Sequence, residues 1–254
     1  MAAALRAKKV TETAWWADRI PQNQWDVYAR VLTLAQQERL PFALGGGLAF
    51  SHYSHRWRNT KDIDLYIQPK DRAHMIDITA RCGLTDYFPV HDYDRSWIHR
   101  TYDPVASDGS SHMIVDIIWQ MANGRSVVDE QWLNRGDVVN VRGITMRVMA
   151  AEELIWTKLY VLQRDRSDWG DLLNVIHECG PALDWAHLLT RVGEDRQLFA
   201  GLINVYAWLC PGGAAQLSPA LYEYLGMARP AVGPAVHEDR VRLLDTRPWF
   251  GHDK

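Results

Sequence analysis

The chain has 254 residues and a formal net charge of −3, with 47% hydrophobic and 23% charged residues, which is ordinary for a folded soluble protein. The weak negative charge argues against a general nucleic-acid-binding protein. The three cysteines are far apart and form no CxxC pair, which argues against a zinc knuckle or a disulfide framework. No stretch approaches the roughly 20 apolar residues that span a bilayer, and residues 1–16 lack the apolar core of a signal peptide. We therefore expect a cytoplasmic protein that contacts no membrane.

Hydrophobic periodicity predicts alternating helices and strands in the first part of the chain. The expected helices are residues 25–40, 48–55 and 71–82. The expected strands are residues 42–44, 62–67, 97–102 and 112–120. Residues 108–110 (Asp-Gly-Ser) read as a turn, and Arg142-Gly143 between residues 137–141 and 144–149 indicates a hairpin.

After Ala150 the pattern becomes helical. The expected helices are residues 151–162, 168–178, 185–192, 197–209 and 219–226. Beyond them, three prolines between residues 228 and 254 argue against one continuous helix. The predicted fold class is α+β: a core with a small mixed β-sheet and flanking helices (residues 22–150), a helical C-terminal domain (residues 151–227) and an extended tail packed on the body (residues 228–254).

Two acids in the predicted strand 62–67 form the first candidate site. Asp62 and Asp64 alternate with aliphatic residues, so both side chains lie on the same face of the strand. Carboxylates held side by side repel each other, and a divalent metal relieves that repulsion. The alternative is a pair of solvent-facing acids on an edge strand.

Asp116 is a third candidate ligand, because it stands alone among the apolar residues of the predicted strand 112–120. Burying an unpaired carboxylate there would be costly, so it needs a positive partner. That partner is either a cation shared with Asp62 and Asp64 on a neighbouring strand or an arginine. Three acids can hold two magnesium ions about 3.5–4 Å apart, as in two-metal phosphoryl-transfer sites.

A glycine turn, Gly45-Gly46-Gly47, follows the predicted strand 42–44. Without side chains, its backbone lets phosphate oxygens approach the amide N–H groups and the N-terminus of the next helix. It is neither a P-loop nor a dinucleotide-binding GxGxxG motif. The alternative is that the three glycines form only a tight turn. Their fixed distance in the sequence from Asp62 and Asp64 favours a phosphate site.

These motifs together resemble the nucleotidyltransferase superfamily of DNA polymerase β. The resemblance rests on GG-x-LA from Gly45, R-x-T-x-D-I-D-L from Arg58, and Val115-Asp116-Ile117, and covers roughly residues 40–175. More narrowly, the first two motifs are similar to AbiEii-type nucleotidyltransferases, found among bacterial toxin–antitoxin proteins, and their uncharacterised relatives. Many superfamily members have Gly-Ser where this chain has Gly46-Gly47, while Gly-Gly is familiar in the AbiEii-like branch.

The resemblance implies a Mg²⁺-dependent enzyme that transfers an NMP from an NTP such as ATP to a hydroxyl acceptor and releases pyrophosphate. Asp62, Asp64 and Asp116 would be the catalytic acids and would bind two Mg²⁺ ions, with Mn²⁺ as an alternative. The nucleotide would contact the residues that match the remaining motif positions, namely Gly45, Gly46, Gly47, Arg58 and Thr60. Related enzymes also carry a lysine followed by a K/R-D-x-x-D run.

That run corresponds here to Lys158, which we expect near the phosphates, and to Asp168 and Asp171. For the two acids, a solvated charged face with internal ion pairs is the alternative. The sequence leaves the acceptor open between a small molecule, a protein side chain and a tRNA 3′ end. A catalytically silent nucleotide- or partner-binding module is the alternative function, and the intact acid triad argues against it. A metal-dependent phosphohydrolase would need histidines at metal-ligand spacing, which the sequence lacks.

Overall fold

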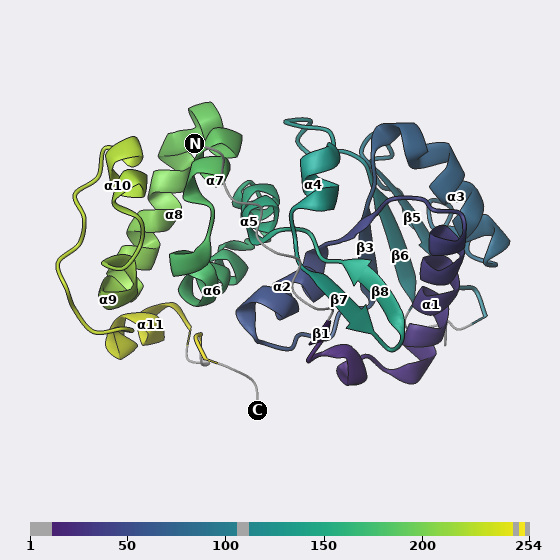
Figure 1. Cartoon of the computed structure of the whole chain (residues 1–254), viewed down its shortest axis with the longest axis horizontal. Coiled ribbons are helices and arrows are strands. Elements are labelled where there is room, and N and C mark those ends of the chain that lie inside the picture. The colour runs from purple at the N-terminus through teal and green to yellow at the C-terminus, as the bar shows by residue number, and fades with distance from the viewer. Residues whose placement is uncertain (1–11, 106–111, 246–248, 252–254) are drawn as a thin grey trace. The chain divides into compact units, whose positions relative to one another are not determined.

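The computed structural model describes residues 12–105, 112–245 and 249–251 (Figure 1). The turn expected at residues 108–110 lies outside these residues. The chain divides into two compact units, residues 1–52 with 57–150 and residues 53–56 with 151–254. We call them the first and second unit and describe each by itself.

In the described part of the first unit, the strands form two small sheets. The five-stranded sheet has the order β2-β3-β6-β5-β4, with β3 and β6 parallel and the other neighbours antiparallel. Its strands are β2 (Ala43–Leu44), β3 (Asp62–Tyr66), β4 (Thr85–Asp86), β5 (Ile98–Tyr102) and β6 (Ile114–Ile118). The three-stranded sheet has the order β1-β7-β8, with strands β1 (Glu12–Thr13), β7 (Val138–Val141) and β8 (Ile144–Arg147).

The helices of the first unit include a pair that lies side by side next to the five-stranded sheet, α1 and α3 (Figure 1). The α-helices are α1 (Gln22–Gln37), α2 (Gly46–Ser54), α3 (Arg72–Arg81) and α4 (Glu130–Asn134). Short 3-10 turns are η1 (Ala17–Arg19) and η2 (Pro69–Asp71). In α1, apolar residues recurring at helical spacing are buried, among them Tyr28, Val31, Leu32 and Ala35.

The strands that carry the acids follow their sequence patterns. In β3 the aliphatic Ile63 and Leu65 are buried and the alternating acids are half-buried, so one face packs on the core. Strand β6 is buried from Val115 to Ile118 because it lies between β3 and β5. At the hairpin between β7 and β8, Arg142 and Gly143 both have positive φ, 48° and 90°, as the tight hairpin turn requires.

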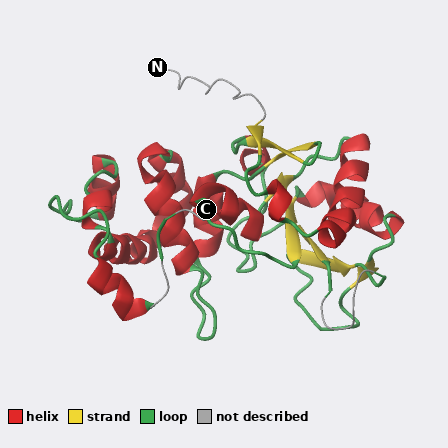
Figure 2. Cartoon of the chain, turned by 90° about the horizontal axis from the view of Figure 1, so that it is seen from below, coloured by secondary structure: helices red, strands yellow, loops and turns green. Residues whose placement is uncertain are grey.

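The described part of the second unit consists of helices and loops without a strand (Figure 2). Its core is formed by aliphatic and aromatic side chains such as Leu159, Ile176 and Phe199, which are fully buried. The α-helices are α5 (Ala151–Leu159), α6 (Trp169–Cys179), α7 (Trp185–Val192), α8 (Arg196–Leu209), α9 (Pro211–Ala214), α10 (Pro219–Leu225) and α11 (Glu238–Leu244), and the 3-10 turns are η3 (Gly180–Ala182) and η4 (Gly193–Asp195).

Two details of the second unit differ from the sequence prediction. Helix α5 ends at Leu159 rather than residue 162, because Leu162 pairs with Ser167 in an isolated bridge that closes the loop to α6. The tail expected to be extended contains α11, whose first turn carries Glu238 and Asp239, acids that suit a helix N-terminus. Near the end of the tail, Arg56 donates to the Trp249 carbonyl at 2.5 Å.

The fold class is α+β, with small mixed sheets and flanking helices followed by a helical part, and the predicted fold class is therefore confirmed. Most predicted helices and strands are present with ends shifted by a few residues. Within the described residues, no helix combines the length and the apolar character that crossing a bilayer would need.

Candidate active site

Asp62, Asp64 and Asp116 lie on adjacent strands of the five-stranded sheet. Asp62 and Asp64 are two residues apart on β3, and Asp64 is the register partner of Asp116 on the parallel strand β6. Residues paired across neighbouring strands have their side chains on the same side of the sheet. The backbone register thus places the three acids that the sequence singled out on the same side of two adjacent strands.

Asp116 is held by an arginine. Arg100 on β5 is its register partner on the other side, and its guanidinium grips the carboxylate with two hydrogen bonds, Nε to Oδ1 at 2.8 Å and Nη2 to Oδ2 at 2.6 Å. This two-pronged geometry is the strong form of an ion pair. The arginine partner left open by the sequence is therefore present.

The electrostatics of two neighbouring groups indicate that the three acids act on the same region. The hydrogen bond to Asp116 raises the pKa of Arg100, and the charges of Asp62 and Asp64 raise it further. Burial raises the pKa of Tyr28 on α1, and all three carboxylates add to this shift while a hydrogen bond from Gln24 opposes it. For Asp116 itself, burial raises the pKa and the Arg100 guanidinium opposes that rise.

The glycine turn lies directly against β3. The Gly45 N–H donates to the Asp64 carbonyl at 2.9 Å, so this amide is used within the fold. Gly46 has φ of +53°, and a Cβ there would lie 1.6 Å from Asp64 Oδ2. Only glycine lets the Asp64 carboxylate approach the start of α2 this closely. Gly47, whose Cβ would meet Thr60 at 3.2 Å, continues the same close packing.

Arg58 and Thr60, the other predicted nucleotide contacts, flank this region. The Thr60 hydroxyl donates to Asp62 Oδ1, and the Thr60 carbonyl accepts from Gln24. The Arg58 guanidinium lies over the Phe50 ring of α2, 5.3 Å from its centroid. Thr60 therefore orients the first acid, and Arg58 is anchored to the helix that follows the glycine turn.

Lys158, in the second unit, is buried and bound by two acids. Its ammonium donates to Asp168 and, at 2.9 Å, to Asp171 Oδ2, while Arg166 also donates to Asp168 at 3.1 Å. Asp168 precedes α6 and Asp171 lies in its first turn, so the cluster ties α5 to α6. The internal ion pairs left open by the sequence are present, and the phosphate contact of Lys158 stays a prediction.

The chemistry of the acids fits a hard divalent cation, since Mg²⁺ and Mn²⁺ take carboxylate oxygens. The Asp64 carboxylate lies where a Cβ of Gly46 would be, so this acid is packed directly against the glycine turn. Among the described residues, no three His, Cys, Asp or Glu side chains are gathered as they would be around an ion. The partner of Asp116 in this structure is the Arg100 guanidinium, which binds both of its carboxylate oxygens.

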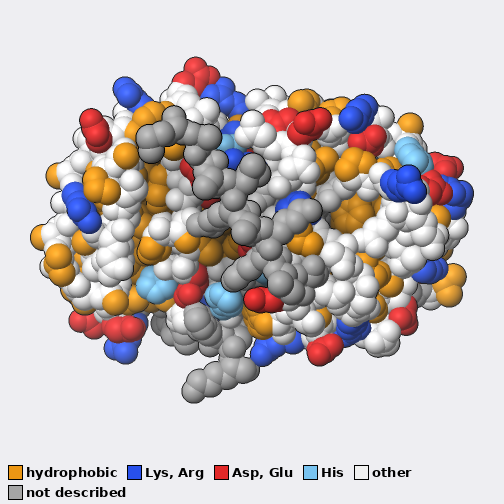
Figure 3. All heavy atoms as spheres, in the orientation of Figure 1, with side chains coloured by type: hydrophobic (Ala, Val, Ile, Leu, Met, Phe, Trp, Pro, Cys, Tyr) orange, Lys and Arg blue, Asp and Glu red, His pale blue; other side chains and the backbone are white. Residues whose placement is uncertain are grey.

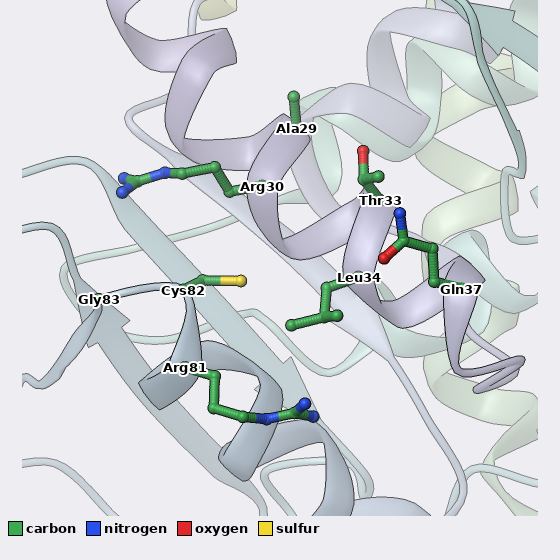
Figure 4. Close-up of a pocket in the computed structure, with 8 residues that line it drawn as sticks. All are labelled: Ala29, Arg30, Thr33, Leu34, Gln37, Arg81, Cys82 and Gly83. Atoms are coloured by element: carbon green, nitrogen blue, oxygen red, sulfur yellow. The ribbon is translucent and has the colours of Figure 1, made fainter.

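A separate open hollow of about 710 Å³ lies between α1 and the end of α3 (Figure 4). The Cys82 side chain projects toward α1 in this hollow. The two arginines that line the hollow are both ion-paired, Arg30 with Asp103 and Arg81 with Glu38 at 2.7 Å. None of the predicted site residues lines it. The full lining comprises Ala29, Arg30, Thr33, Leu34, Gln37, Arg81, Cys82 and Gly83.

Charged side chains of both signs are interspersed on the face drawn in Figure 3. Among the described residues coloured there, Lys and Arg do not gather into a continuous basic area. This distribution agrees with the weak negative net charge and gives no sign of a large nucleic-acid footprint on that face.

No protein-family model and no curated protein matches the chain. Solved structures do. The antibiotic-resistance factor ANT(2'')-Ia is 17% identical over 73% of this chain and 97% of its own, with a TM-score of 0.46. The lincosamide antibiotic adenylyltransferase LnuA is 14% identical over 61% and 96%, with a TM-score of 0.41. An antigenic nucleotidyltransferase-like protein from Paracoccidioides brasiliensis is 16% identical over 85% and 97%, with a TM-score of 0.45.

Sequence reasoning did not single out Arg100 or Tyr28 as part of this region. Arg100 follows Ile98 and His99 in a segment with no catalytic motif, and only the antiparallel register of β5 sets it opposite Asp116. The one usable signal was the need of a buried Asp116 for a positive partner, which identified the kind of residue and not its position.

Proposed function

We propose that this chain is a metal-dependent nucleotidyltransferase, which transfers an NMP from an NTP to a hydroxyl acceptor and releases pyrophosphate. The observation that carries the proposal is the register pairing of Asp64 with Asp116, with Asp62 two residues along the same face of β3. Three carboxylates on adjacent strands, one of them packed against a glycine turn, suit a reaction in which a polyphosphate must be positioned and its charge neutralised.

Asp62, Asp64 and Asp116 would hold the magnesium or manganese. When bound, the metal neutralises the triphosphate charge and lowers the pKa of the acceptor hydroxyl. Thr60, which donates to Asp62, would keep that carboxylate oriented. The same acids could bind one or two ions, and we propose two, as the family resemblance implies.

The glycine turn would receive the triphosphate through the first turn of α2. The N–H groups at the start of a helix have no partners within the helix and favour anions. Since the Gly45 amide already donates to Asp64, the amides of Gly46 and Gly47 are the ones we assign to phosphate. Arg58, anchored on Phe50, would add positive charge on the same side of the turn.

The reaction forms a bond between the acceptor oxygen and the α-phosphorus and breaks the bond to the oxygen that leaves with pyrophosphate. We assign the acceptor's proton to Asp116. Positioning and charge neutralisation would supply most of the rate, because the protein forms no covalent intermediate in this scheme.

The test is incubation of the full chain with each α-labelled NTP, Mg²⁺ and a cell extract separated into RNA, protein and small-molecule fractions. We expect label in one fraction, lost in Asp64→Asn and retained in Asp77→Asn. Asp77 is a matched control, because it is a surface acid of α3 in an ion pair with Arg81. The labelled fraction identifies the acceptor class.

Equal labelling by wild type and Asp64→Asn would contradict the proposal. NTP binding without label in any fraction would instead favour the catalytically silent binding module. The AbiEii-type assignment is a narrower proposal that rests on the sequence motifs alone. It predicts that expression of the active chain arrests bacterial growth and that Asp64→Asn does not.

A further inference from the structure

Arg100 occupies the carboxylate that the proposed metal would need. Its Nε and Nη2 reach one oxygen each of Asp116, at 2.8 and 2.6 Å. A carboxylate has about four lone-pair positions, and this grip uses one on each oxygen. A positive group thus already engages both oxygens of the carboxylate that a cation shared by Asp64 and Asp116 would need.

The two partners differ in their freedom to move. The Asp116 side chain is 1% exposed, whereas that of Arg100 is 32% exposed. The Asp116 carboxylate is fixed in a strand between β3 and β5, while the Arg100 side chain that binds it is partly exposed to solvent. If one partner leaves the pair, it is therefore Arg100, whose charged head can be hydrated without unfolding the sheet.

We propose that Arg100 is a resident counter-cation, which neutralises Asp116 in the metal-free protein and is displaced from it when a divalent cation binds. This inference rests on the proposed function, because it concerns the same three acids. Arg100 thus competes with the metal for Asp116, and the ion pair lowers the affinity of the three acids for a divalent cation.

The sign of one effect distinguishes this role from its rival. If Arg100 competes with the metal, its removal takes away the positive charge bound to Asp116 and increases cation affinity. If Arg100 instead positions Asp116 as a ligand, its removal releases the carboxylate from its productive orientation and lowers affinity. A positioning arginine and a competing arginine thus predict opposite shifts.

The first test is a Mn²⁺ titration of the full chain without nucleotide, with free Mn²⁺ followed by electron paramagnetic resonance. We expect Arg100→Gln to bind Mn²⁺ about tenfold more tightly than wild type, because a nearby positive charge has been removed. Arg95→Gln is the matched control, since Arg95 also forms a single ion pair in this unit, with Asp86 at 2.9 Å, and should leave affinity unchanged. Equal or weaker binding by Arg100→Gln overturns the inference.

A second measurement uses wild-type protein and does not depend on the variant folding. In ¹⁵N-labelled protein, the Arg100 Nε–Hε resonance is identified by its loss in Arg100→Lys and followed during Mg²⁺ titration. We expect it to move from an ion-paired position toward that of a hydrated guanidinium. A resonance that stays in place at saturating Mg²⁺ overturns the displacement.

The outcomes separate this inference from the proposed function. Tighter Mn²⁺ binding by Arg100→Gln supports the inference whether or not wild type transfers label. Label transfer that depends on Asp64, together with weaker Mn²⁺ binding by Arg100→Gln, retains the proposed function and rejects competition between Arg100 and the metal. Absence of Mn²⁺ binding in every variant also rejects this competition, and the labelling assay then tests the proposed function separately.

Discussion

Arg100 and Asp116 form an ion pair whose two members have unequal exposure, 32% and 1% of their side chains. A buried charge that loses its partner cannot be rehydrated, whereas an exposed one can. The two halves of this pair should therefore differ in how much the fold depends on them.

Removing Arg100 should destabilise the first unit more than neutralising Asp116. We expect Arg100→Gln to cost about 3 kcal/mol in metal-free protein, because it leaves a buried carboxylate uncompensated. Asp116→Asn should cost about 1.5 kcal/mol, the loss of a charge-assisted hydrogen bond. Amide hydrogen exchange of β5 and β6, measured with a chelator present, reports both. Equal protection in the two variants would contradict the asymmetry.

Gly46 should tolerate substitution less than Gly143, although both have positive φ, 53° and 90°. At Gly143 a Cβ would meet nothing within 4 Å, so Gly143→Ala should cost only the left-handed backbone strain, about 1 kcal/mol. Gly46→Ala adds an overlap with the Asp64 carboxylate and should cost about 3 kcal/mol in total. Urea unfolding followed by tryptophan fluorescence compares them. Similar midpoints would mean that Asp64 can move aside freely.

The arrangement of helices and strands was largely predictable because their apolar periods are local. The alternation in Asp62–Tyr66 and the helical spacing in Gln22–Gln37 are each read within one element. Elements without room for a period were missed, such as α9 (Pro211–Ala214) and β1 (Glu12–Thr13). Their formation depends on packing rather than on local pattern.

The candidate site was predictable only in part, for the same reason. Alternation alone sets Asp62 and Asp64 on one face of β3. The pairing of Asp64 with Asp116, and of Asp116 with Arg100, depends on strand order and register, which are tertiary properties. Likewise, no spacing rule indicates that Lys158 is held by Asp168 and Asp171.

The Lys158 cluster should make the second unit sensitive to acid. Burial alone would raise the pKa of Asp168, but hydrogen bonds from Arg166 and Lys158 and their charges outweigh it, so the pKa is lowered. A lowered folded-state pKa contributes stability above the unfolded value of about 3.9, and this stability is lost as pH falls through the folded pKa. Asp168→Asn should therefore reduce stability at neutral pH and flatten its decline below about pH 5.

Denaturant unfolding of wild type and Asp168→Asn at a series of pH values from neutral to strongly acid measures this change. Glu223→Gln, at an exposed acid of α10 in the same unit, is the control and should follow wild type. Lys158→Met should shrink the pH dependence as well, because it removes one of the two cations that favour ionised Asp168. An unchanged acid limb in both variants would mean that the cluster does not stabilise the fold.

Cys210 should be nearly inert toward thiol reagents in the folded protein. Its side chain is buried, and burial raises the pKa of the thiol to about 12. At pH 8 this reduces the reactive thiolate about a thousandfold relative to a free cysteine of pKa about 8.5, and exclusion of the reagent slows the reaction further.

Cys82 and Cys179 are only half-buried, so we expect native protein to react in two well-separated phases with a coloured disulfide reagent. Cys210→Ser should lose the slow phase alone, and denatured wild type should react in one fast phase. Three fast thiols in native protein would mean that the α8–α9 junction, where the buried Cys210 lies, opens readily.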